Sequence, residues 1–389
     1  MINIAFNIKG DATGKLLTTP KCYRLWEKIV SFHHEELTNE LIWLFSNITP
    51  ENNEVGYDIL NSTVLNKYLL SFLEEKLNPE DLTEKNLEKI ERATCLLCNL
   101  LQDDDEKKNI NIQDIKKRIF KIFIKFLDVD NKNIFLNILR GFETQKKSLV
   151  IYLDILEEAN IFEKLIKKTK NVDLVVRMYS NRVVGNYLSF KNVDKLDLEF
   201  INLLLNFESD NLEQEVVEIR KESAWSLSNM AIDSSEITKL IVNHPKIIEE
   251  LINLAKKEER ADALAEIMIC LSLLVVNSNF NDFFTLMNHY LFPILIDGIK
   301  KLSSLPFSLP FIFQAIFKSL QYGETIRNQK EQNCILNKFI ELGGYDILEK
   351  YQNTQDVQLY QCIQAIMSQF FNGKSNEIIV DEEEHINNN

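Results

Sequence analysis

Two Trp–Asn pairs are the residues in this chain whose types and spacing indicate chemistry. They are Trp225 with Asn229, in RKESAWSLSNMAI (220–232), and Trp43 with Asn47, in LTNELIWLFSNITPENNE (37–54). Residues four apart share one face of a helix. An Asn side chain donates and accepts hydrogen bonds, so it can hold an extended peptide backbone. An indole face binds the stem and charge of Lys or Arg, a contact worth about 0.5–2 kcal/mol. The pairs predict a surface that grips basic peptides.

The elements that carry these pairs recur along the chain. The same two positions hold Arg182 and Asn186 in one unit and Cys95 and Asn99 in another, and Asn7 occupies the Asn position of the first unit. Other units replace the pair by apolar residues, such as Ile269 and Leu273. A period of about 40–47 residues, with two or three helices per unit, is typical of armadillo or HEAT repeats.

The composition favours helices throughout. Only 10 Gly and 7 Pro occur in 389 residues, and no Gly/Ser/Pro-rich linker divides the chain. Repeats that stack on their neighbours explain how so long a chain lacks a domain boundary. We predict an all-α fold, an armadillo-repeat right-handed superhelical solenoid, over residues 1–372. About nine repeats are expected, the first incomplete. An acidic and polar disordered tail is expected over 373–389.

The net charge of −14 excludes several classes of partner. It repels nucleic acid and anionic membranes and favours basic partners. The longest apolar run, LSLLVV (271–276), is far shorter than the ~20 residues of a membrane span. The six cysteines are scattered through apolar helical pattern, which indicates reduced thiols. We expect no nucleic-acid partner and no membrane association.

Motifs for catalysis or metal binding are weak. GDATGKL (10–16) resembles a phosphate loop, but its glycines are too close together and Leu16 fills the Ser/Thr position. Cys95 and Cys98 have the spacing of a redox or zinc motif, yet no second pair lies nearby. We predict a binding protein rather than an enzyme, without a metal or cofactor.

Five stretches in order resemble the importin-α family, whose armadillo repeats bind nuclear localisation signals. RKESAWSLSNMAI is similar to that family's seventh repeat, and VVGN (183–186), preceded by Arg182, is similar to its sixth. LQYGE (320–324) resembles the end of the ninth repeat, ELGGYDILEKYQNTQDVQLYQCIQAIMSQFF (341–371) resembles the tenth, and DEEE (381–384) resembles the acidic tail. The similarity runs from end to end but is weak between these motifs.

The resemblance implies an adaptor for nuclear protein import, present in cytoplasm and nucleus. Its cargo would be lysine-rich segments, and Glu51 matches the acidic position that pairs with the key lysine. An importin-β-type carrier and a nuclear export receptor are implied partners. The sequence begins within the second repeat of the family pattern and shows no basic importin-β-binding segment. Cys95 also replaces the Trp of the fourth repeat, and we expect weaker binding than in an intact adaptor.

Two questions stay open from the sequence. Arg182 could bind a peptide carbonyl, an acidic cargo residue or a carboxylate of the groove itself. The chain as a whole could instead be an armadillo scaffold, or a dedicated chaperone for one basic client, that no longer carries import cargo.

Overall fold

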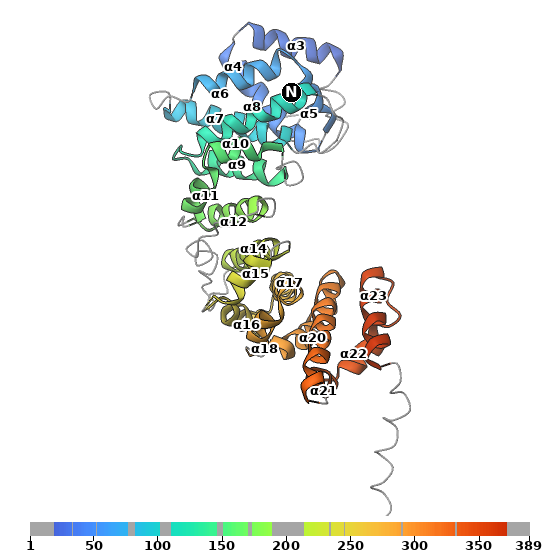
Figure 1. Ribbon diagram of the computed structural model, residues 1–389. Helices are drawn as coiled ribbons and strands as arrows, with labels where there is room; N and C mark the ends of the chain where they lie inside the picture. Colours follow the sequence, from blue (N-terminus) through green and yellow to red (C-terminus); the bar gives the residue numbers. More distant parts are fainter. Residues whose placement is uncertain are drawn as a thin grey trace, which may run out of the picture. The chain divides into compact units, whose positions relative to one another are not determined.

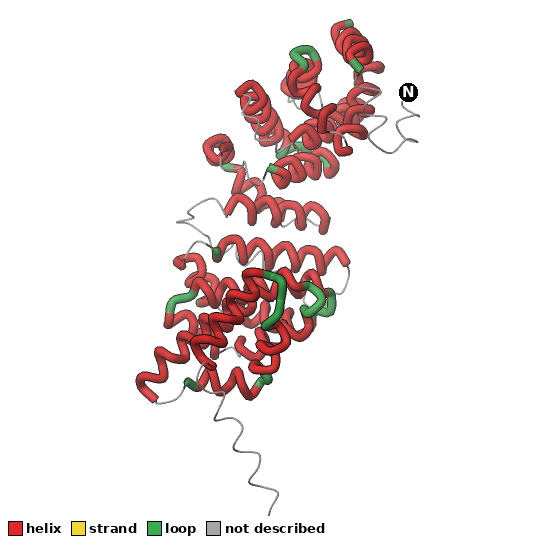
Figure 2. Tube along the Cα trace, turned by 90° about the vertical axis from the view of Figure 1, so that its right-hand side faces the viewer, coloured by secondary structure: helices red, strands yellow, loops and turns green. Residues whose placement is uncertain are grey.

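The computed structural model describes residues 19–32, 34–51, 53–76, 82–101, 110–145, 151–169, 173–188, 214–232, 235–244, 246–288, 291–330 and 333–371. These residues are helical almost throughout and contain no strand (Figure 2). The chain divides into two compact units, Met1–Phe190 and Lys191–Asn389. The predicted tail and Asn7 lie outside the described residues.

The first unit consists of short helices that follow one another along the chain and recur as repeat units (Figure 1). They are α3 (Pro20–Ser31), α4 (Glu35–Ile48), the 3-10 turn η1 (Thr49–Glu51), α5 (Asn53–Asn61), α6 (Leu65–Glu75), α7 (Glu84–Leu101), α8 (Ile110–Phe126), α9 (Lys132–Thr144), α10 (Leu153–Glu158), α11 (Ile161–Thr169) and α12 (Leu174–Leu188). Helices α4, α7, α9 and α12 pack successively against one another. Each contains one pair of positions that the repeat pattern aligns, so we call these four the ladder helices of the first unit.

The second unit follows the same order. It contains α14 (Gln214–Ala231), α15 (Ser235–Val242), α16 (Ile247–Lys257), α17 (Ala261–Asn277), α18 (Phe280–Asn288), α19 (Leu291–Lys301), the 3-10 turn η4 (Pro306–Ser308), α20 (Leu309–Lys330), α21 (Cys334–Glu341), α22 (Gly344–Tyr351), α23 (Val357–Ile366) and the π-helical turn η5 (Met367–Phe371). Its ladder helices are α14, α17, α20 and α23, again packed in sequence.

Local sequence signals fix the ends of several helices. The Asn131 side chain accepts a hydrogen bond from the Ile134 N–H at 3.0 Å and caps α9, which satisfies a donor that the helix cannot pair. Between α21 and α22 the chain turns at Gly343, whose φ of 80° favours glycine. Because the helices begin and end at such residues, the chain turns back after each short helix and each ladder helix can pack on the next.

The ladder helices carry much of the core. Helix α17 is apolar nearly all round because it packs against α14, α16, α19 and α20. Its Cys270 and Leu274 side chains are fully buried. In the first unit, the ring of Phe120 on α8 stacks on Tyr152 at 4.3 Å and lies 5.2 Å from Phe142 of α9. This packing holds the ladder helices in place and leaves one face of each for other contacts.

Candidate functional site

Three ladder helices of the first unit line one groove with a volume of about 460 Å³. Its walls are Trp43, Ser46 and Asn47 from α4, Glu88, Glu91, Arg92 and Cys95 from α7, and Asn133, Leu136, Asn137 and Arg140 from α9. The structure thus brings together Trp43, Asn47 and Cys95, three of the residues that the repeat pattern selected. Their convergence makes this groove the candidate site.

The Trp43–Asn47 pair forms the end of the groove contributed by α4. Trp43 is half-buried and Asn47 is exposed. One amide N–H of Asn47 donates to the Trp43 carbonyl of its own helix at 2.8 Å. No described residue bonds the Asn47 side-chain oxygen, so this oxygen and the second amide hydrogen can pair with a ligand backbone.

The groove also contains charged residues that the repeat pattern did not select. Glu88 and Glu91 supply two carboxylates, and Arg92 and Arg140 supply two guanidinium groups. The three on α7 precede Cys95 by seven, four and three residues, so they extend the same helix face toward its N-terminus. Inspecting the same helix face for two turns before each aligned pair would have identified these three residues.

Asn99 has a role inside the protein. Its side-chain N–H donates to the Ser46 carbonyl of α4 at 2.8 Å, which ties two neighbouring ladder helices together. It is half-buried and does not line the groove. Glu51 ends the turn η1 directly after α4, and its side chain is not among those described. A peptide contact at Asn99, Glu51 or Asn7 stays a prediction.

Replacing Asn99 by Ala is expected to lower the free energy of unfolding by about 0.5–1.5 kcal/mol, because one hydrogen bond between helices is lost. Asn47→Ala is the matched control, since among the described residues this exposed side chain bonds only its own helix, and its loss should cost less. The midpoints of urea denaturation measure both changes. An equal or larger cost for Asn47→Ala would contradict the structural role of Asn99.

At the last ladder helix of the first unit, the charged residue of the aligned pair already has a partner within the protein. Arg182 on α12 donates to the Glu143 carboxylate of α9 at 2.6 Å, which matches the third of the alternatives that the sequence left open. Glu143 occupies the Asn position of its own repeat. Asn186 is only 2 % exposed. A peptide could reach Asn186 only after the covering residues move, so its contact with a ligand stays a prediction.

The second unit carries the other complete pair on α14. Trp225 and Asn229 are both half-buried. The Asn229 amide nitrogen is inaccessible to solvent and has no hydrogen-bond partner. Buried donors without a partner are uncommon in folded proteins and cost about 1–3 kcal/mol. Because this nitrogen is closed to solvent, a ligand carbonyl could reach it only after the covering residues move, so a peptide contact at Asn229 stays a prediction.

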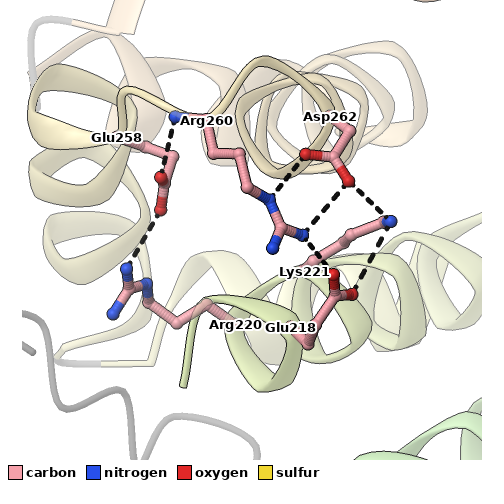
Figure 3. Close-up of polar contacts among 6 residues, drawn as sticks. All are labelled: Glu218, Arg220, Lys221, Glu258, Arg260 and Asp262. Atoms are coloured by element: carbon pink, nitrogen blue, oxygen red, sulfur yellow. Dashed lines mark hydrogen bonds and ion pairs between the residues drawn. The ribbon is translucent and has the colours of Figure 1, made fainter. Parts of the chain in front are cut away.

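An ionic network fixes α14 against the start of α17 (Figure 3). Arg260 donates to both oxygens of Asp262 at 2.7 and 3.1 Å and pairs with Glu218 at 2.7 Å. Lys221 donates to Asp262 at 2.8 Å. Partial burial by itself would raise the pKa of Asp262, but the hydrogen bonds from Lys221 and Arg260 lower it to about 2. Asp262 is therefore ionised at neutral pH and keeps the helix carrying Trp225 in register with its neighbour.

The environment of the cysteine pair disfavours thiolate chemistry. Burial raises the pKa of Cys95, against a smaller opposite effect of Arg140, and raises the pKa of Cys98 to about 12. The reactive form of a cysteine is its thiolate, so the raised pKa makes both side chains less reactive than a freely exposed cysteine at neutral pH. In the described part of the chain no cluster of His, Cys, Asp and Glu is placed to hold a metal ion. None of the described helices is long and apolar enough to cross a membrane.

Comparisons with known proteins identify the fold. No protein-family model matches the chain, and no curated protein matches its sequence. Among solved structures, an engineered protein matches with a TM-score of 0.64 and 16% identity over 94% of this chain and 93% of its own. A designed armadillo repeat protein matches with a TM-score of 0.50 and 14% identity, over 64% of this chain and 98% of its own.

A second designed armadillo repeat protein, solved in complex with the peptide (KR)4, matches with a TM-score of 0.50 and 16% identity over 64% of this chain and 98% of its own. At such low identities, likeness between structures shows the fold and not the function. The predicted fold class is confirmed: the chain is an all-α armadillo-repeat solenoid.

Proposed function

We propose that this protein binds extended, Lys- and Arg-rich peptide segments along its ladder helices and serves as an adaptor for nuclear localisation signals. One observation carries the proposal. The groove of the first unit combines the indole of Trp43, the exposed carboxamide of Asn47 and the carboxylates of Glu88 and Glu91. These are the groups that an extended basic peptide requires for its side-chain stems, its backbone and its charges.

The distance between successive ladder helices matches the length of a few residues of an extended peptide. Packed helices lie about 8–10 Å apart. An extended chain rises about 3.3 Å per residue, so each ladder helix corresponds to about three peptide residues. A Lys or Arg at such intervals would meet the same face of successive ladder helices. The designed armadillo repeat protein in complex with (KR)4 supports this mode of binding by analogy of fold.

The cellular role in this proposal is nucleocytoplasmic transport. The protein would move between cytoplasm and nucleus, with an importin-β-type carrier and a nuclear export receptor as further partners. The support is the set of five importin-α-like stretches, including 220–232 and 341–371. In the structure these two stretches fall in α14 and in α21–α23.

Trp43→Ala is expected to weaken binding of an eight-residue alternating Lys-Arg peptide by about two- to thirtyfold. This range follows from a cation–π contact of about 0.5–2 kcal/mol, where each 1.4 kcal/mol corresponds to tenfold. Isothermal titration calorimetry at one fixed salt concentration measures it. Affinity equal to that of the wild type would refute a cation site at Trp43.

Two controls accompany this measurement. Tyr57→Ala removes an aromatic ring of α5 in the same unit that does not line the groove, and it should leave the affinity unchanged. A peptide of the same length built from Glu should bind much more weakly, because the indole face attracts cations and the carboxylates of Glu88 and Glu91 repel anions. Equal binding of the Lys-Arg and Glu peptides would mean that the proposed selection of cations is wrong.

A second candidate is a scaffold, or a chaperone for one basic client, that no longer carries import cargo. Its specific support is the state of the ladder: Arg182 is paired with Glu143, and Asn99 is bonded to the Ser46 carbonyl. Affinity purification from cells distinguishes the two. Many basic nuclear proteins together with an import carrier would support the adaptor, and one stoichiometric partner would support the scaffold.

A further inference from the structure

Arg92 occupies the position that a peptide cation would need. Its guanidinium carbon lies 5.7 Å from the centre of the Trp43 ring. One nitrogen pairs with Glu40 of α4 at 3.1 Å and another pairs with Glu88 of its own helix at 2.7 Å. A side chain of α7 is thus held on the indole of the preceding ladder helix by two carboxylates.

This arrangement reproduces each contact expected of a bound Lys or Arg. The indole face attracts the cation, and the carboxylates pair with its N–H groups. The cation–ring contact recurs at the next pair of ladder helices, where the guanidinium of Arg140 on α9 lies 5.3 Å from the ring of Tyr179 on α12. The chain therefore supplies its own guanidinium groups to aromatic rings on two of its ladder helices.

Resting on the proposed function, we propose that Arg92 is an internal competitor for the Trp43 face and sets the affinity of the groove for basic peptides. A peptide Lys or Arg reaches the indole only when the Arg92 side chain leaves it. The exchange replaces one cation by another on the same carboxylates, so the free-energy gain from this subsite is smaller in the wild type than in a chain without the Arg92 guanidinium. Only loss of the internal cation makes the subsite fully available.

The Arg92 side chain is exposed enough to move away from the Trp43 ring. The Arg92 side chain is 26% exposed, and those of Glu40 and Glu88 are 46% and 66% exposed. Ion pairs with this much solvent contact contribute little, about 0–1 kcal/mol each. The opposite alternative is that Arg92 holds Trp43 in its binding orientation. The two alternatives predict effects of opposite sign on peptide affinity.

The test is a double-mutant cycle with Arg92→Gln and Trp43→Ala, titrated with the alternating Lys-Arg octapeptide by calorimetry at fixed salt. We expect Arg92→Gln to bind about three- to tenfold more tightly than the wild type, since a competing cation–π contact is lost. In the Trp43→Ala background the same substitution should change affinity by less than about twofold, because Arg92 and the peptide cation then have no indole for which to compete. Arg92→Lys, which keeps the charge but loses the planar fork, should show a smaller gain.

Arg118→Gln is the matched control for charge. Arg118 of α8 pairs with Glu74 of α6 at 2.5 Å and does not line the groove. Its replacement also removes one positive charge, so it measures the general electrostatic effect on peptide binding. We expect less than about twofold from this control, because surface charges outside the groove are screened by salt.

The possible outcomes distinguish a failure of the proposed competition by Arg92 from a failure of the proposed peptide-binding function. If Trp43→Ala weakens peptide binding relative to the wild type, but Arg92→Gln leaves it unchanged or weakens it, the proposed competition is wrong and the proposed function stands. An equal gain for Arg118→Gln, or an undiminished gain in the Trp43→Ala background, would also overturn the competition alone. Absence of peptide binding in the wild type and in Arg92→Gln would overturn the proposed function as well. Binding that appears only in Arg92→Gln would support both.

Discussion

Replacing Arg220 by Met is expected to lower the free energy of unfolding by about 3–5 kcal/mol, the usual cost of breaking a buried ion pair. Arg220 of α14 is 1% exposed, and its guanidinium lies 3.2 Å from the carboxylate of Glu258, before α17. Without Arg220 the Glu258 carboxylate keeps the Arg260 backbone N–H, at 3.1 Å, as its hydrogen-bond donor. One amide does not replace a cation at a site closed to water. Urea denaturation at neutral pH, followed by circular dichroism, measures the loss.

The double variant Arg220→Met/Glu258→Leu tests whether the stranded charge is the cause. Removing both charges leaves an apolar pair, so most of the lost stability should return. Asp262→Asn is the control from the exposed part of the same network, and it should cost only about 0–1 kcal/mol because this side chain is 44% exposed. If Arg220→Met cost no more than Asp262→Asn, the buried pair would not be a main support of the α14–α17 junction.

The repeat pattern allowed the ladder to be predicted, for a clear physical reason. Residues four apart share a helix face whatever the rest of the fold does. Trp43 and Asn47 therefore lie on one side of α4, and the equivalent position on α7 places Cys95 in the same groove. The paucity of Gly and Pro and the recurring period were sufficient to indicate an all-α armadillo solenoid.

Contacts between repeats were beyond prediction from the sequence. The spacing shows which face Asn99 occupies, but its bond to the Ser46 carbonyl depends on how closely α4 and α7 approach. The same holds for Arg92 on Trp43, because a helix period does not say which long side chain of a neighbour reaches an indole. The burial of Asn186 likewise arises from packing around α12 rather than from spacing within it.

A large loss in the first unit is expected from Phe120→Ala, about 3–5 kcal/mol, which is typical for a fully buried aromatic residue. Phe120 is inaccessible to solvent, and its ring contacts Tyr152 and Phe142 at 4.3 and 5.2 Å. Its loss would leave a cavity between α8, α9 and the residues that begin the next repeat. The midpoint of thermal unfolding, followed by circular dichroism, measures the effect.

Phe32→Ala makes the same chemical change at a side chain that is 80% exposed, and it should alter stability by less than about 0.5 kcal/mol. Equal costs for the two variants would contradict the aromatic core of the first unit. The pair of variants also bears on the groove. A repeat protein is stabilised mainly by contacts between neighbouring repeats, so a cavity behind α9 weakens its packing on α7 and α12. Peptide affinity should consequently fall in Phe120→Ala at temperatures where Phe32→Ala still binds normally, although neither ring lines the groove.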